Sequence, residues 1–239
     1  MSAARDAAAL AAARRLVQAE SLRESLEALA HPGIGRVIAL GDSLTADPAS
    51  WAQILRHAFR LLRRGNAVSM VNLGVGGDTT VHLVSRFAAV MAADPDVVIA
   101  MAGTNDARRH GRSACRVLVP DRETHRNLDL LRSLTRAETR ASIWLITPPP
   151  VLEERILGAP ALVRERVSWR ASDVERKAAV VRRVGGQIID SRAALRPPLS
   201  KFFRADGLHL TLAGQERLAR WVVECLARDA LGGHGRTGR

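Results

Sequence analysis

The sequence has no tyrosine, and phenylalanine and tryptophan bring its aromatic content to only 3%. Surfaces that bind single-stranded nucleic acid stack the bases on aromatic side chains, so this composition argues against that class of protein. There are two cysteines, Cys115 and Cys225, and neither belongs to a C-x-x-C pair or to a cluster with zinc-ligand spacing. The sequence therefore predicts neither a disulfide framework nor a cysteine-based metal site.

Long apolar runs are also missing. No stretch reaches the roughly 18 apolar residues that a membrane-spanning helix needs, so we expect no membrane span. The alanine-rich stretch AAALAAA at residues 7–13 is followed at once by Arg14 and Arg15, with no small-residue cleavage site after a clean apolar core. This is not the pattern of a secretory signal, and we expect a cytoplasmic protein.

Lysine is nearly absent, since the 36 basic residues include only Lys177 and Lys201. The net charge of +12 and the sequence pI of about 11.4 could indicate a nucleic acid, an anionic membrane surface or an acidic substrate. The arginines are scattered and form no compact block, which favours a composition bias. We expect no specific nucleic-acid partner. The alternative, a basic nucleic-acid-associated binding protein, predicts retention on DNA or RNA that falls steeply with salt.

The first residues predict a helix. Leucines recur at helical spacing over residues 3–30, and His31-Pro32-Gly33 ends the pattern. Such an apolar face suits pairing of two chains into a homo-oligomer, although a solvent-facing or self-packed helix fits the pattern equally. We therefore divide the chain into a helical extension over residues 1–31, one domain over residues 32–230 and a flexible tail over residues 231–239.

Apolar strands and amphipathic helices alternate after this helix. The predicted strands cover residues 36–40, 68–73, 96–102, 142–146 and 187–189. The predicted helices cover residues 51–62, 80–91, 122–134, 172–184 and 214–227. Five β-α repeats predict an α/β domain with a five-stranded, mainly parallel sheet. Residues 151–170 predict an irregular loop with a short helix.

Polar residues gather after the strands, where ligands bind in an open α/β sheet. The segments are Gly41-Asp42-Ser43-Leu44, Asn72–Thr80, Gly103-Thr104-Asn105-Asp106 and Asp206–Thr211. Taken alone, Ser43 fits a helix cap, Asn105 an Asx turn and His209 a structural or solvated histidine. The glycines at residues 74–77 are not a dinucleotide loop, because Thr79 stands where G-x-G-x-x-G needs glycine.

Together, the four segments resemble the sequence blocks of the SGNH hydrolases, also called GDSL esterases/lipases, in the order of that family. The resemblance spans residues 41–209 and implies a three-layer, flavodoxin-like α/β/α sandwich. It implies a serine esterase that hydrolyses acyl esters through an acyl-enzyme, with Ser43 as nucleophile, His209 as base and Asp206 orienting the base. The implied oxyanion hole combines the backbone N–H groups of Ser43 and Gly77 with the Asn105 amide, and no metal or cofactor is implied.

The departures from the family pattern are small. Gly76 stands where serine is frequent, and Leu212 stands where proline is common. The substrate stays open, because the family includes carboxylesterases, thioesterases, lysophospholipases and carbohydrate deacetylases. The basic loop over residues 107–121 fits either an anionic leaving group or a solvated loop. The segment over residues 151–170 fits either an apolar wall for an acyl chain or core packing. The intact catalytic residues argue against a non-catalytic binding domain.

Overall fold

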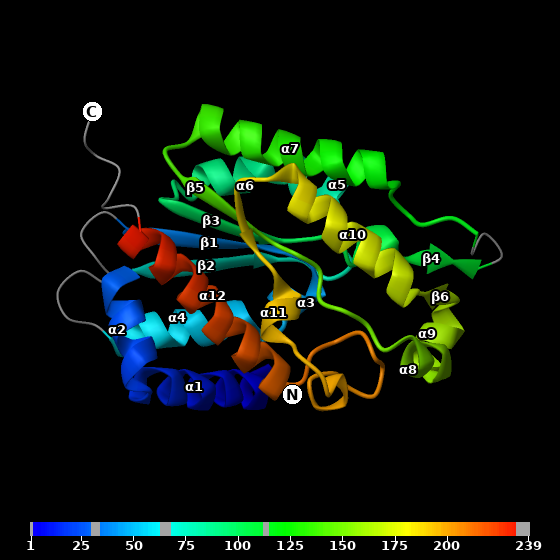
Figure 1. Cartoon of the computed structure of the whole chain (residues 1–239), viewed down its shortest axis with the longest axis horizontal. Helices are drawn as coiled ribbons and strands as arrows, with labels where there is room; N and C mark the ends of the chain where they lie inside the picture. Colours follow the sequence, from blue (N-terminus) through cyan, green and yellow to red (C-terminus); the bar gives the residue numbers. More distant parts are fainter. Residues whose placement is uncertain (1, 30–33, 63–67, 112–114, 233–239) are drawn as a thin grey trace.

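A computed structural model of the chain describes residues 2–29, 34–62, 68–111 and 115–232. Its centre is a parallel sheet with the strand order β2-β1-β3-β5-β7. The strands are β1 (Arg36–Gly41), β2 (Ser69–Gly74), β3 (Val97–Met101), β5 (Ser142–Ile146) and β7 (Gln187–Ile189). Helices cover both faces of this sheet (Figure 1), which confirms the predicted three-layer α/β/α sandwich.

Neighbouring residues of a strand point to opposite faces of a sheet, and each face has its own hydrophobic core. In β1, Val37 and Ala39 face one core, whereas Ile38 and Leu40 face the other. The first core is covered mainly by α4 (Trp51–Leu61) and α12 (Leu212–Gly232). The second is covered by α5 (Thr80–Ser85), α6 (Phe87–Ala92), α7 (Asp121–Glu138) and α10 (Ala171–Val184). The inner strands of the sheet are thus buried between helices, whereas the two outer strands, β2 and β7, are partly exposed.

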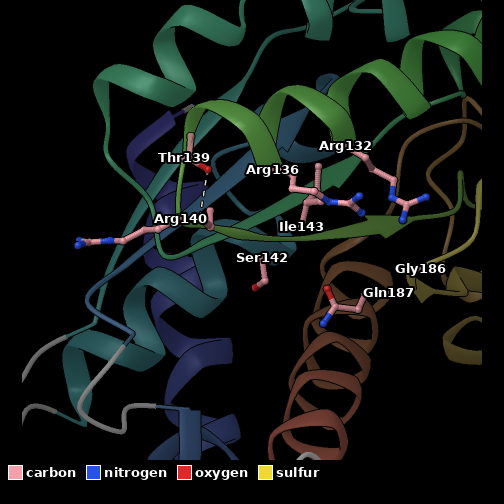
Figure 2. Close-up of a pocket in the computed structure, with 9 residues that line it drawn as sticks. Arg132, Arg136, Thr139, Arg140, Ser142, Ile143, Gly186 and Gln187 are labelled. Atoms are coloured by element: carbon pink, nitrogen blue, oxygen red, sulfur yellow. Dashed lines mark hydrogen bonds between the residues drawn. The ribbon is translucent and has the colours of Figure 1, made fainter.

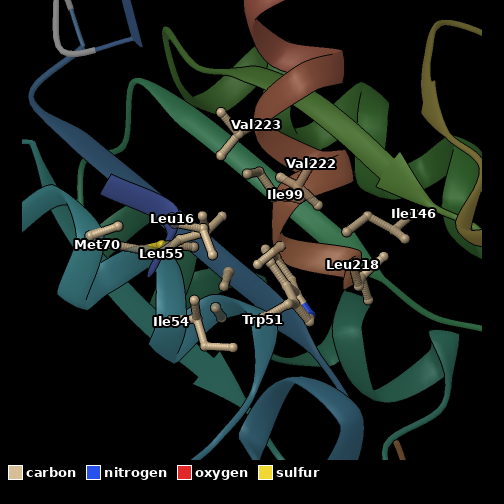
Figure 3. Close-up of a cluster of buried hydrophobic side chains, with 14 of the residues drawn as sticks. Leu16, Trp51, Ile54, Leu55, Met70, Ile99, Ile146, Leu218, Val222 and Val223 are labelled. Atoms are coloured by element: carbon tan, nitrogen blue, oxygen red, sulfur yellow. The ribbon is translucent and has the colours of Figure 1, made fainter. Parts of the chain in front are cut away.

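The N-terminal residues form two helices instead of the single helix predicted over residues 3–30. Helix α1 (Ser2–Gln18) packs on α4, and α2 (Glu20–Leu29) packs on α12. The break at Ala19 lets the two apolar faces follow these different partners. Leu16 and Leu26 are fully buried in the first core, and Figure 3 shows Leu16 among the other side chains of that core. The face considered for pairing two chains is therefore covered within the chain.

Two predicted segments have a different local structure. The helix predicted over residues 80–91 is divided at Arg86, whose guanidinium binds the Asp78 carboxylate and the Leu73 carbonyl. Residues 151–170 form α8 (Glu153–Gly158), α9 (Pro160–Glu165) and the short strand β6 (Val167–Ser168), which pairs antiparallel with β4 (Arg109–His110). Ile156 and Trp169 are buried in a small third core, so much of this segment is core packing.

The remaining elements are short. They are α3 (Ser43–Ala46), the 3-10 helices η1 (Asn105–Ala107) and η3 (Leu199–Lys201), and α11 (Ser191–Ala194). The predicted helix stop at residues 31–33 lies outside the described residues. The tail predicted over residues 231–239 begins within α12, which ends at Gly232, and the rest of it lies outside the described residues. Within the described ranges, no helix combines the length and the apolar character needed to cross a membrane.

Candidate active site

The turn after β1 presents Ser43 at the carboxyl edge of the sheet. A Cβ on Gly41 would lie 2.4 Å from Oγ1 of Thr45, so this position requires glycine. The buried Asp42 carboxylate caps α3 by accepting a hydrogen bond of 2.9 Å from the Leu44 N–H. Ser43 is the first residue of α3, and the N–H groups of a first helical turn have no acceptor within the helix. Its N–H is thereby available, and its side chain is half-buried.

Three side chains from distant parts of the sequence form one hydrogen-bonded line. Oγ of Ser43 lies 3.1 Å from Nε2 of His209, and Nδ1 of His209 lies 2.8 Å from Oδ2 of Asp206. The other oxygen of Asp206 accepts hydrogen bonds of 2.9 Å from the backbone N–H groups of Leu208 and His209. The structure thus brings together the three residues that the sequence pointed to, and it holds the Asp206 carboxylate in one orientation.

The loop that carries His209 is held at both ends. Phe203 and Leu210 form an antiparallel bridge across its base, and the Arg204 N–H donates a hydrogen bond of 2.8 Å to the His209 carbonyl. From α8, Nη1 of Arg155 donates to the carbonyls of Phe203 and Arg204 at 3.0 and 3.2 Å. These hydrogen bonds satisfy polar backbone groups of a loop that has no regular secondary structure. The His209 imidazole is therefore positioned by the fixed loop backbone as well as by its contacts with Ser43 and Asp206.

The glycine and asparagine segments meet beside Ser43. Gly77 has a φ of 84°, a backbone conformation that favours glycine. It lies in a turn that is closed by a hydrogen bond of 3.3 Å from the Asp78 N–H to the Val75 carbonyl. Nδ2 of Asn105 donates to the Asp78 carbonyl at 3.0 Å and makes a long contact of 3.5 Å with Oδ2 of Asp42. These residues follow β2, β3 and β1, which are adjacent strands, so their convergence follows from the sheet order.

The environment shifts the pKa values of three groups around Ser43. The hydrogen bond to Asp206 raises the pKa of His209 above 6.5, although burial opposes the change. Burial acts to raise the pKa of Asp206, but its hydrogen bonds from His209 and the backbone outweigh burial and lower it. Burial raises the pKa of Asp42 to about 7 against the hydrogen bond from the Leu44 N–H. At neutral pH, Asp206 is therefore the charged partner of the imidazole.

Two supporting contacts were not assigned from the sequence. The fully buried Asp106 carboxylate accepts hydrogen bonds from the N–H and Oγ1 of Thr80 and from Oγ1 of Thr124, at 2.9, 2.7 and 2.7 Å. It ties the segment carrying Asn105 to α5 and α7. Nε1 of Trp169 donates to the Thr104 carbonyl at 2.8 Å. Asp106 lies within the recognised block and could have been assigned, whereas no sequence signal connects Trp169 with this segment.

The basic loop over residues 107–121 is only partly exposed to solvent. Arg109 is 6% exposed and its Nε lies 2.5 Å from Oδ2 of Asp173, which also pairs with Arg176. Arg109 therefore anchors the loop to α10. Residues 112–114 of the loop lie outside the described part of the chain.

A second arginine cluster lies at the opposite edge of the sheet (Figure 2). It borders a cavity of 370 Å³ lined by residues that include Arg132, Arg136, Arg140, Ser142 and Gln187. Ser142 and Gln187 begin β5 and β7, whereas Ser43 follows the end of the parallel strand β1. Arg140 also forms an ion pair of 3.2 Å with Asp96. This cavity cannot contact the Ser43 side chain. Among the described residues, no group of three or more His, Cys, Asp or Glu side chains is arranged to hold a metal ion.

A sequence comparison decides the family. Residues 39–217 match the model of the GDSL-like lipase/acylhydrolase family, which covers well over half of the chain. The chain belongs to this family. It is therefore a hydrolase that acts on ester bonds. The comparison with curated proteins gave no match.

Solved structures of other proteins share the fold of this GDSL-like hydrolase. Axe2, an acetylxylan esterase from Geobacillus stearothermophilus, aligns with a TM-score of 0.63 at 21% identity, covering 81% of this chain and 96% of its own. LAE5, an alpha/beta hydrolase enzyme from the metagenome of Lake Arreo, aligns with a TM-score of 0.64 at 20% identity, covering 80% and 94%. A G-D-S-L family lipolytic protein from Desulfitobacterium hafniense aligns with a TM-score of 0.58 at 18% identity, covering 80% and 99%. At these identities the likeness concerns the fold.

Proposed function

We propose that this protein is a serine esterase that hydrolyses carboxylic esters through an acyl-enzyme formed on Ser43. The observation that carries the proposal is the line from Ser43 through His209 to Asp206, with contacts of 3.1 and 2.8 Å. A serine hydroxyl is a weak nucleophile at its own pKa and needs a neighbouring base. The imidazole of His209 can act as this base, because Nε2 faces the serine hydroxyl while Nδ1 is hydrogen-bonded to the Asp206 carboxylate.

In the proposed acylation step, Nε2 of His209 takes the proton of the Ser43 hydroxyl while Oγ attacks the ester carbonyl. The negative charge that develops on the carbonyl oxygen is stabilised by the N–H groups of Ser43 and Gly77 and by the Asn105 amide. One hydrogen of that amide already holds the Asp78 carbonyl, so we assign the hydrogen that makes only the long contact with Asp42 to the oxyanion. His209 then protonates the leaving alcohol.

In the proposed deacylation step, water attacks the acyl-enzyme and His209 again accepts the proton. The carboxylic acid leaves and the Ser43 hydroxyl is restored. Asp206 stays ionised throughout, since its pKa is held below its ordinary value, and it stabilises the imidazolium at each step.

The activity is expected to depend on pH through His209. The imidazole must be neutral to accept the serine proton, and its pKa lies above 6.5. The value of kcat/KM should therefore be low in acid and rise with pH, reaching half its plateau above pH 6.5. A profile of kcat/KM for a neutral p-nitrophenyl ester from pH 5 to 9 measures this midpoint. A plateau that is already complete at pH 6 would contradict His209 as the base.

Covalent labelling tests the nucleophile directly. A fluorophosphonate should lose fluoride and leave its phosphonyl group on Oγ of Ser43, which mass spectrometry of the digested protein locates. Replacing His209 by alanine should slow labelling strongly, because the hydroxyl then has no base. Unlabelled Ser142, at the other edge of the sheet, is the internal control. An adduct at another residue, or turnover that persists without labelling, would reject Ser43.

A further inference from the structure

A charged side chain stands beside the candidate oxyanion hole without a partner among the residues that the structure describes. Arg108 follows Asn105 by three positions, and its N–H donates to the Asn105 carbonyl at 3.2 Å. A Cβ placed on Gly77 would lie 3.8 Å from Nη1 of Arg108, and one placed on Gly76 would lie 4.0 Å from Cβ of Ser43. The guanidinium therefore lies just across the glycine turn from the proposed nucleophile.

The Arg108 guanidinium is unpaired among the described residues. Its Nε is buried and has no hydrogen-bond acceptor. Nε also lacks a hydrogen bond in Arg56 and Arg192. In both of these arginines, however, a terminal guanidinium nitrogen is bonded: that of Arg56 donates a hydrogen bond to Gln53, and that of Arg192 forms an ion pair with Glu175. No described ion pair or side-chain hydrogen bond involves Arg108. A buried donor without an acceptor costs free energy and calls for an explanation.

Nearby acids do not serve as its partner because other groups already occupy them. The Asp78 carboxylate accepts two hydrogen bonds from Arg86, at 2.9 and 2.6 Å. The Asp106 carboxylate is bonded to the hydroxyls of α5 and α7, including that of Thr80 at 2.7 Å. Within the described part of the chain, the cation is thus left available to bind a group that comes from outside.

We propose that Arg108 binds an anionic oxygen group, a carboxylate or a phosphate, that the ester substrate carries close to its reacting carbonyl. This inference rests on the proposed function. A guanidinium presents a planar set of donors that matches the oxygens of either anion. The site also holds the ionised carboxylate of Asp206, which repels an anionic substrate, and the charge of Arg108 beside Gly77 offsets this repulsion.

Matched pairs of esters test the inference on the full chain. The comparison of mono-p-nitrophenyl adipate with p-nitrophenyl hexanoate tests a carboxylate on the acyl side of the ester. The comparison of 3-acetoxybenzoate with its methyl ester tests a carboxylate on the leaving group. 3-Acetoxyphenyl phosphate against phenyl acetate tests a phosphate. We expect at least one anionic ester to be preferred. The ratio of its kcat/KM to that of its neutral partner should fall about 10- to 100-fold in Arg108→Gln and less in Arg108→Lys.

The control is Arg116→Gln, which removes an exposed arginine from the same loop and should leave every ratio unchanged. Added salt should weaken the preference of the wild-type protein and have less effect in Arg108→Gln. The inference would be overturned, with the proposed function left standing, if every anionic ester had a kcat/KM equal to or lower than that of its neutral partner. The same conclusion would follow if Arg108→Gln left the ratios of kcat/KM unchanged. Turnover that survives Ser43→Ala, or no turnover of any ester, would overturn the proposed function and this inference with it.

Discussion

Replacing Ser43 by alanine is expected to lower kcat/KM for p-nitrophenyl esters by on the order of 10⁵- to 10⁶-fold. The variant lacks the oxygen that lies 3.1 Å from Nε2 of His209, so no acyl-enzyme can form. What remains is the direct attack of water on an ester held by the oxyanion donors, which is far slower than attack by the activated serine. Initial rates on esters from acetyl to long acyl chains, with each variant compared at the same enzyme concentration, measure the loss.

Ser142→Ala is the matched control, because it removes a serine hydroxyl from the opposite edge of the sheet. We expect its rates to equal those of the wild-type protein. Ser43 begins a short helix and its side chain is only half-buried, so circular dichroism and thermal unfolding of Ser43→Ala should also match the wild type. Undiminished ester hydrolysis in a folded Ser43→Ala variant would show that another residue attacks the ester.

Asp206→Asn is expected to lower kcat by about 10⁴-fold through a change of tautomer. One carboxylate oxygen of Asp206 accepts from two backbone N–H groups and the other accepts from Nδ1 of His209. Asparagine has one oxygen, and if it keeps the backbone bonds, its NH₂ group faces Nδ1. The imidazole proton then moves to Nε2, which faces Ser43 and can no longer accept the serine proton.

Single-turnover acylation measures this loss, and ¹⁵N chemical shifts of the His209 ring report which nitrogen carries the proton. Asp129→Asn, an exposed substitution on α7, controls for the loss of one negative charge. The backbone bonds of the loop are retained in Asp206→Asn, so we expect its thermal unfolding to stay close to that of the wild type. An unaltered kcat would mean that Asp206 does not set the orientation of the base.

The sheet was predictable because each strand is an apolar run between polar turns. All five residues of β3 are buried, and such a run has no plausible place except between two layers of helices. The helix boundaries were less predictable, because the breaks at Ala19 and at Arg86 depend on tertiary contacts. The interruption at Arg86 follows from its ion pair with Asp78 and its bond to the Leu73 carbonyl, neither of which helix propensity describes.

The candidate site likewise has residues that the sequence predicted and residues whose role only the structure shows. Ser43, Asn105 and His209 stand in short blocks whose spacing is visible in the chain, and strand order explains why they converge. The two arginines that follow Asp106 cannot be told apart by sequence. Arg109 is bonded to Asp173, 64 positions further along, whereas Arg108 lies beside Gly77 with no such partner among the described residues. Only the folded chain distinguishes the two arginines.

The packing of α2 on α12 also constrains how the protein folds during synthesis. Helices α1 and α2 are synthesised before the strands of the sheet, but α2 packs on α12, which is synthesised after all of those strands, and Arg15 pairs with Glu216 across 201 positions. Until α12 emerges, the leucines of α2 have no lasting cover and remain a target for chaperones and for aggregation. The first core therefore closes only after α12 has been synthesised, and a chain that terminates before α12 cannot bury the leucines of α2.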